Sequence, residues 1–225
     1  MPLTKIMEIK KEDFKNETIH LLSYYSKYYC EQYIACEELF ENQKGHLALF
    51  NLLALFENIM KSTLNDFEDT FYNLNLRLKE KNLINELELK FLNDKKVGIR
   101  KIRNILAHAN LSKYDLDIIG NEITFPFTEN ETCLILYQHI STIISGIILK
   151  ILEPSMIVNY EINTNSQIEK LKFNFITRTP EELMKFKGIE INAEWEKLDE
   201  ATKYRLVENS SDVNVLTEIF KGLKQ

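Results

Sequence analysis

Apolar residues recur along most of this chain at three- and four-residue steps, the spacing that places side chains on one face of an α-helix. The pattern predicts helical regions over residues 12–42, 46–78, 82–93 and 95–114, and a further helix that follows Thr128 and stops before Pro154. The region 46–78 is the most strongly periodic, and its apolar face needs cover along its whole length. We therefore expect it to be the central helix of a bundle, or to extend into a dimer.

Local signals mark where these helices begin and where they give way to strands. Asn93-Asp94 supplies an N-cap for the helix 95–114, and Thr128 with Glu131 resembles a capping box. Gly120-Asn121 stands between two short apolar-rich runs, 115–119 and 122–125, which predicts a β-hairpin directly after the helix 95–114.

The pattern changes beyond Pro154. Runs at 156–162 and 170–176 have the β-branched and aromatic composition of strands, whereas 181–187, 193–208 and 212–223 are helical in pattern, the first capped by Thr179-Pro180. We predict a mainly α protein with a helical bundle at 1–153 and an α+β accessory segment at 154–225 packed on it.

Composition agrees with long helices, because the chain of 225 residues is 44% hydrophobic and contains only 6 Gly and 4 Pro. No signal-like segment opens it, and charged residues interrupt the apolar runs, so we expect no membrane-spanning helix. Cys30, Cys36 and Cys133 form no CxxC pair and read as reduced thiols of a cytoplasmic protein, with no metal site.

Positive charge is concentrated at 95–114. The stretch holds no acid and six basic residues, which are Lys95, Lys96, Arg100, Lys101, Arg103 and Lys113. They contribute +6, so the other 205 residues must carry −12 to give the net charge of −6. A basic strip in an acidic protein is typical of a site for a polyanion such as RNA, and the alternative is a solvated helix face.

The polar face of this predicted helix combines three functional groups. Ile102 and Ile105 define its apolar face, and on the opposite side Asn104 and His108 are stacked one turn apart. Arg103 flanks them, and the small Ala107 leaves a gap between the guanidinium and the imidazole.

The segment Arg103-Asn104-Ile105-Leu106-Ala107-His108 resembles the R-x4-6-H motif of the HEPN superfamily, in which a polar residue commonly follows the Arg. The resemblance covers roughly residues 12 to 153. It implies a HEPN-like helical bundle, metal-independent RNase activity with Arg103 and His108 as motif residues, and a homodimer that places two motifs in one cleft. It also implies a toxin or anti-phage defence role, with a cognate antitoxin or defence-system partner. Some HEPN toxins carry Tyr two residues after the His; Asn110 stands here, so silencing by modification of that tyrosine is not expected.

The same chemistry follows from the residues themselves. RNA carries its own nucleophile, the 2′-hydroxyl, so cleavage needs proton transfer and charge stabilisation but no cofactor. The imidazole of His108 exchanges protons near neutral pH, and the guanidinium of Arg103 stabilises a phosphorane. Asn104 can orient the ring or hold a phosphate oxygen. Glu57, at the edge of the apolar face of 46–78, either orients Arg103 from across the bundle or lies on a solvated flank.

Two other classes of protein fit the same residues. One is a HEPN-like domain that binds RNA or a nucleotide without cleaving it, as a sensor or scaffold. The other is a helical interaction module whose basic face docks an acidic partner.

Overall fold

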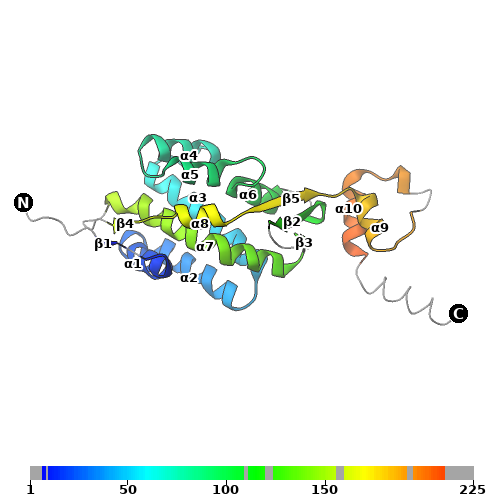
Figure 1. Cartoon of the computed structure of the whole chain (residues 1–225), viewed down its shortest axis with the longest axis horizontal. Helices are drawn as coiled ribbons and strands as arrows, with labels where there is room; N and C mark the ends of the chain where they lie inside the picture. Colours follow the sequence, from blue (N-terminus) through cyan, green and yellow to red (C-terminus); the bar gives the residue numbers. More distant parts are fainter. Residues whose placement is uncertain are drawn as a thin grey trace, which may run out of the picture.

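The computed structural model describes residues 7–8, 10–108, 111–119, 124–155, 160–191 and 195–210, without the side chains of residues 7, 8, 108, 124, 155 and 160. In this part of the chain the protein is mainly helical, with ten α-helices and a small three-stranded antiparallel sheet. Figure 1 shows the bundle at one end, the two last helices at the other, and the sheet between them. The mainly α architecture predicted from the sequence is confirmed.

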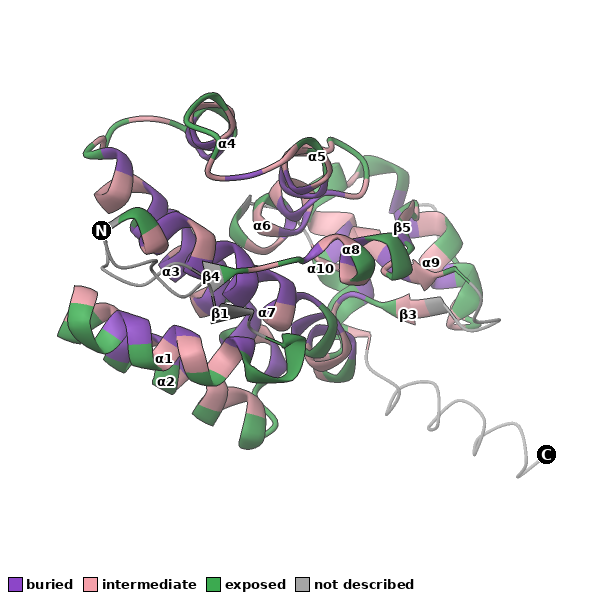
Figure 2. Ribbon diagram, turned by 60° about the vertical axis from the view of Figure 1, so that its left-hand side comes forward, coloured by how far each residue is buried: buried purple, intermediate pink, exposed green. Residues whose placement is uncertain are grey.

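Two long helices form the centre of the bundle. α3 (Gly45–Leu64) and α7 (Asn130–Leu152) pack against each other, and α1 (Phe14–Tyr25) and α2 (Lys27–Glu41) cover them. In Figure 2 the two central helices are mostly buried, whereas α1 and α2 expose their outer faces. α7 is buried at nearly every position of its second half, so this part of the helix makes contacts on most of its sides.

Two predicted helical regions are each broken in two. The region 12–42 divides at Ser26, whose backbone is extended and whose hydroxyl accepts a hydrogen bond from the N–H of Tyr29. The region 46–78 is not one helix, because α3 ends at Leu64 and α4 occupies Phe71–Glu80. Asn65 adopts a left-handed conformation (φ 50°) that ends α3, and Thr70 caps α4. The spacing of apolar residues does not reveal this break, because the spacing of α3 continues into α4.

The remaining helices of the bundle are short. α5 spans Glu86–Asn93 and begins with a capping box between Asn85 and Glu88. α6, which carries the R-x4-H segment, spans Ile99–His108 and is shorter than the predicted 95–114. The residues before it form a turn, and a 3₁₀ turn at Leu111–Lys113 follows the undescribed residues 109–110.

The capping box predicted at Thr128 and Glu131 is absent. The N-cap of α7 is Glu129, and no side chain caps this end of the helix. Instead Asn130 joins the starts of the two central helices: its Oδ1 accepts a hydrogen bond from the N–H of Gly45 (2.7 Å), and its Nδ2 donates to the carbonyl of Gln43 (3.0 Å).

The predicted hairpin is confirmed. β2 (Tyr114–Ile118) pairs antiparallel with β3 (Thr124–Pro126), and the Gly120-Asn121 turn lies outside the described residues. β5 (Phe173–Thr177), from the predicted strand at 170–176, pairs with the other edge of β2, so that Leu116 faces Phe125 on one side and Phe175 on the other. In addition, β1 (Met7–Glu8) pairs parallel with β4 (Tyr160–Glu161).

The segment after residue 154 has two parts, one that packs on the main core and one that has a small core of its own. α8 (Asn165–Lys170), which the sequence pattern did not predict, packs against α5, and Ile168 and Phe173 belong to the main core. Beyond β5, α9 (Pro180–Phe186), a 3₁₀ turn (Trp195–Lys197) and α10 (Glu200–Asn209) enclose a second small core. The predicted capping of α9 is confirmed as a Thr179–Glu182 capping box, whereas the helix predicted at 193–208 begins only at Glu200. The predicted helix 212–223 and residues 156–159 lie outside the described residues, and the domain division at 153 stays a prediction.

One buried carboxylate joins three helices. Glu88 of α5 is fully buried, and its oxygens accept hydrogen bonds from Lys150 of α7 (2.7 Å) and from Thr164 at the start of α8 (2.5 Å). The same side chain completes the capping box with the N–H of Asn85 (2.8 Å). Glu88 therefore fixes how α8, and through it β5, meets the bundle.

α3 and α7 are long and apolar enough to cross a membrane, which the sequence analysis did not anticipate. Most of the apolar window of each helix is buried inside the bundle, as is usual for core helices. Figure 2 colours most of both helices as buried.

Candidate functional site

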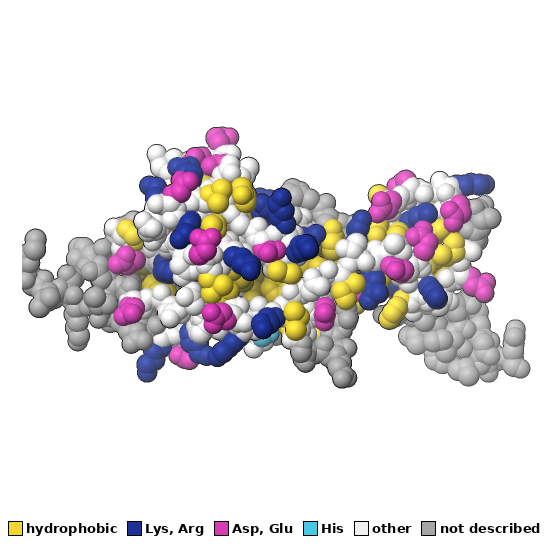
Figure 3. Space-filling view, turned by 45° about the horizontal axis from the view of Figure 1, so that its top comes forward, with side chains coloured by type: hydrophobic (Ala, Val, Ile, Leu, Met, Phe, Trp, Pro, Cys, Tyr) yellow, Lys and Arg dark blue, Asp and Glu magenta, His cyan; other side chains and the backbone are white. Residues whose placement is uncertain are grey.

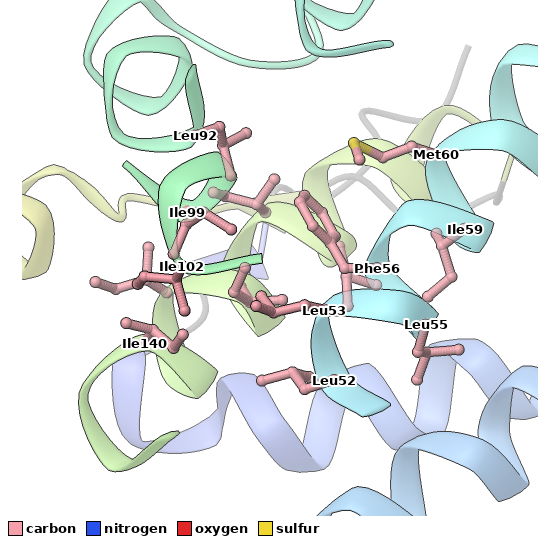
Figure 4. Packing of buried hydrophobic residues seen from close by; sticks show 14 of the residues in the cluster. Leu52, Leu53, Leu55, Phe56, Ile59, Met60, Leu92, Ile99, Ile102 and Ile140 are labelled. Carbon is pink, nitrogen blue, oxygen red and sulfur yellow. The ribbon is translucent and has the colours of Figure 1, made fainter. Parts of the chain in front are cut away.

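α6 is held against the bundle by one narrow apolar face. Ile99, Ile102 and Ile105 are buried, and Figure 4 shows Ile99 and Ile102 beside Leu92 of α5, with Phe56 of α3 across the cluster. The predicted core face of this helix is thereby confirmed. Its opposite side, with Asn104 and Ala107, is exposed.

The turn before α6 sets where the helix begins. The carboxylate of Asp94 accepts hydrogen bonds from the backbone N–H groups of Lys96 (2.7 Å) and Val97 (3.0 Å), and these bonds lower the pKa of Asp94 below its usual value. Gly98 is required here because an added Cβ would lie 2.6 Å from backbone atoms of Asp94. Asp94 therefore organises the turn, and the helix starts later than the sequence pattern predicted.

Glu57 and Arg103 form an ion pair between α3 and α6. The Nη2 of Arg103 donates to Oε2 of Glu57 at 2.9 Å, and Lys61 lies 3.0 Å from the other carboxylate oxygen. Glu57 is only 8% exposed, so the alternative of a solvated flank is wrong. The Arg103 side chain is 33% exposed, so its guanidinium is anchored at one end and open to solvent at the other.

Asn104 lies directly beside this pair. Its Oδ1 is 3.4 Å from Nη1 of Arg103, a weak hydrogen bond between two exposed groups. The structure thus brings together Glu57, Arg103 and Asn104. His108 is the last residue of α6, one turn beyond Asn104, and its side chain lies outside the described residues, as do Ala109 and Asn110.

The predicted RNA-binding cations do not form one row. Arg100 lies over the ring of Tyr72 (4.9 Å), on the side of α6 that faces α4, and Lys101 lies over Tyr114 of β2 (4.5 Å). Arg103 and Lys101 are about 160° apart around the helix. Figure 3 shows basic and acidic side chains interspersed over the face of the bundle that it displays.

The three remaining lysines differ in how far their charge is compensated. Lys113 donates to Glu200 of α10 at 3.0 Å, a bond that raises the pKa of Lys113. Lys95 and Lys96 are exposed, and neither forms an ion pair within 4 Å among the described residues. Lys95 and Lys96 are therefore the lysines of this stretch most accessible to a polyanion.

Sequence reasoning missed two neighbours of the site. Lys61 follows Glu57 by four residues on α3, a spacing that favours an ion pair and was available in the sequence. Tyr72 gave no such signal, because its approach to Arg100 depends on the break between α3 and α4. Among the described residues, no three His, Cys, Asp or Glu side chains gather as metal ligands would.

Comparison with known proteins gives no relative: no family model, curated protein or solved structure matches the chain.

Proposed function

We propose that this protein is a metal-independent endoribonuclease of HEPN type, in which Arg103 and His108 act on the RNA phosphate. The observation that carries the proposal is the ion pair between Arg103 and the buried Glu57, at 2.9 Å, beside the exposed side of α6. Because Glu57 anchors one nitrogen of the guanidinium, the other donors of Arg103 have a defined direction toward solvent.

A guanidinium fixed in this way suits a phosphate. It retains N–H donors that can bind two phosphoryl oxygens at once. The exposed amide of Asn104 adds a donor beside it, and the small exposed side chain of Ala107 leaves room for the phosphate. These features support an oxyanion-stabilising role for Arg103.

His108 supplies proton transfer in this proposal. The 2′-oxygen of RNA attacks the adjacent phosphorus while its proton passes to a base, and the bond from phosphorus to the 5′-oxygen breaks as that oxygen receives a proton. The products are a 2′,3′-cyclic phosphate and a 5′-hydroxyl. An imidazole performs one of these transfers near neutral pH. A second copy of the chain would supply the other histidine, so we propose a homodimer with two motifs in one cleft.

The direct test is incubation of the purified protein with end-labelled single-stranded RNA in EDTA. The proposal expects cleavage and products that end in a 2′,3′-cyclic phosphate. Binding without cleavage would instead support the second candidate, an RNA-binding scaffold. That candidate is favoured by the pairing of Arg100 with the partly exposed Tyr72, since a cation beside an accessible ring is a typical stacking surface for bases.

A further inference from the structure

A second basic site lies away from α6. A cleft of about 480 Å³ is lined by the start of α1 with the 3₁₀ turn before it (Lys11–Asp13), the end of β2, α7, and the junction from α8 to β5. None of its lining residues belongs to the stretch 95–114. The cleft is therefore independent of the Arg103 site.

The charge of this cleft is strongly positive. Its lining contains four lysines, Lys11, Lys15, Lys170 and Lys172, and one acid, Glu12. Lys15 is paired with Glu37 at 2.8 Å, and Lys11 makes a loose, exposed contact with Glu12 at 3.8 Å.

The charges of two of these lysines are not compensated by an ion pair. Lys170 and Lys172 are exposed, and neither forms an ion pair with a described residue. In a protein with a net charge of −6, such a concentration of ammonium groups attracts anions to one place.

Neutral donors and an apolar wall complete the lining. Gln138, His139 and Thr142 project from one side of α7, and each offers a hydrogen bond to a phosphoryl oxygen. Ile119 and Leu171 provide apolar surface in the same lining, and Ile119 is 60% exposed although it is large and hydrophobic. An anion alone would leave this wall uncovered.

We propose that the cleft binds a small organic polyphosphate, such as a nucleoside triphosphate. Lys170 and Lys172 contact its phosphates, together with Lys11, and its organic part packs on Ile119 and Leu171. The volume falls in the range of small-ligand sites, and five separate elements enclose it, which suits a compact ligand better than a continuous RNA strand. This binding is a function beyond the proposed RNA cleavage.

The test is isothermal titration of the full chain with ATP, tripolyphosphate and adenosine as separate probes. ATP should bind more tightly than tripolyphosphate, and adenosine most weakly, because only ATP uses both the lysines and the apolar wall. The double variant Lys170→Ala/Lys172→Ala should weaken ATP binding about tenfold or more. The matched control Lys95→Ala/Lys96→Ala removes two exposed lysines elsewhere and should bind ATP as the wild type does.

Three results would overturn the proposal. The first is no ATP binding at about 1 mM. The second is equal affinity for ATP in the wild type and the Lys170/Lys172 variant when both melt at the same temperature. The third is displacement of ATP by a short RNA that binds the cleft more tightly. ATP binding to His108→Ala separates this proposal from the RNase proposal. That variant should bind ATP normally whether or not the wild type cleaves RNA.

Discussion

The guanidinium of Arg103 on α6 lies 2.9 Å from the carboxylate of Glu57 on α3, and this carboxylate is almost completely buried. A second cation, Lys61, occupies the other oxygen of Glu57. The pair joins two helices through residues that are 46 positions apart in sequence, and it places an arginine beside the exposed Asn104. Glu57 is thus a positioning residue for Arg103 in the proposed mechanism.

We predict that Glu57→Gln lowers the rate of RNA cleavage about ten- to a hundredfold, because misdirecting a charge-stabilising group costs about this much. Its neutral amide no longer holds Arg103 by charge. The effect should fall on kcat more than on KM, and Glu57→Asp should recover part of the rate. A Glu57→Gln variant with an unchanged kcat would remove Glu57 from the mechanism.

The buried carboxylate of Glu88 is expected to stabilise the folded protein. Glu88→Ala removes the only ion-pair partner of Lys150 among the described residues and one half of the capping box of α5. Breaking a buried pair in this way typically costs about 3–5 kcal/mol. Urea unfolding followed by circular dichroism should show a loss of this order.

Glu86→Ala is the matched control for this prediction. Glu86 lies in the same first turn of α5, its side chain is 82% exposed, and it is 3.6 Å from Lys79. Its removal should change the free energy of unfolding by less than about 1 kcal/mol. Equal effects of the two substitutions would contradict the role assigned to Glu88.

The three described cysteines give a pH prediction. All are free and buried, and burial raises the pKa of the Cys36 and Cys133 thiols to about 12. Between about pH 9 and pH 12 the unfolded chain loses these protons while the folded chain keeps them. The folded state then binds more protons, so stability falls as pH rises, by about 1.4 kcal/mol per pH unit for each thiol.

Urea unfolding at pH 8 and pH 10 measures this slope. The variant Cys36→Ala/Cys133→Ala should lose less stability over this interval than the wild type, even if it is less stable at pH 8. A slope that the double substitution leaves unchanged would show that these thiols do not titrate as their burial requires. The two thiols should also react slowly with alkylating reagents in the native protein.

The oligomeric state is a further prediction. If two motifs share one cleft, light scattering at micromolar concentration should give the mass of a dimer. Mixed dimers of Arg103→Ala and His108→Ala chains should show whether the two copies contribute different groups to one site. A monomer that cleaves RNA at the full rate would rule out the shared cleft.

The sequence predicted the kinds of element well and their limits poorly. The apolar face of α6 and the hairpin were readable because periodicity and a Gly-Asn turn report on local structure. The break at 65–70 was not, since Asn65 and Thr70 end one helix and cap the next without interrupting the apolar spacing. The pairing of β5 with β2 and of Glu88 with Lys150 depends on tertiary contacts that no local pattern encodes.

Part of the candidate site could be predicted from the sequence, and part could not. The apolar spacing places Glu57 at the edge of the apolar face of α3, and the structure places its carboxylate against Arg103. The six cations of 95–114 were predicted as one strip, yet the helix directs Arg100 and Lys101 to different neighbours. Helical geometry separates residues that are adjacent in sequence, which a count of charges does not show.

The proposed cleavage of RNA by Arg103 and His108 can be decided by one measurement. It is the initial rate of RNA cleavage in EDTA for the wild type, His108→Ala and Arg103→Ala, with a melting temperature for each. The control His20→Ala replaces an exposed histidine on α1. We expect losses of about 10² to 10⁴ for His108→Ala and about 10² to 10³ for Arg103→Ala. The His20→Ala rate should not change. A His108→Ala protein that melts like the wild type and cleaves at the same rate would show that His108 takes no part in RNA cleavage.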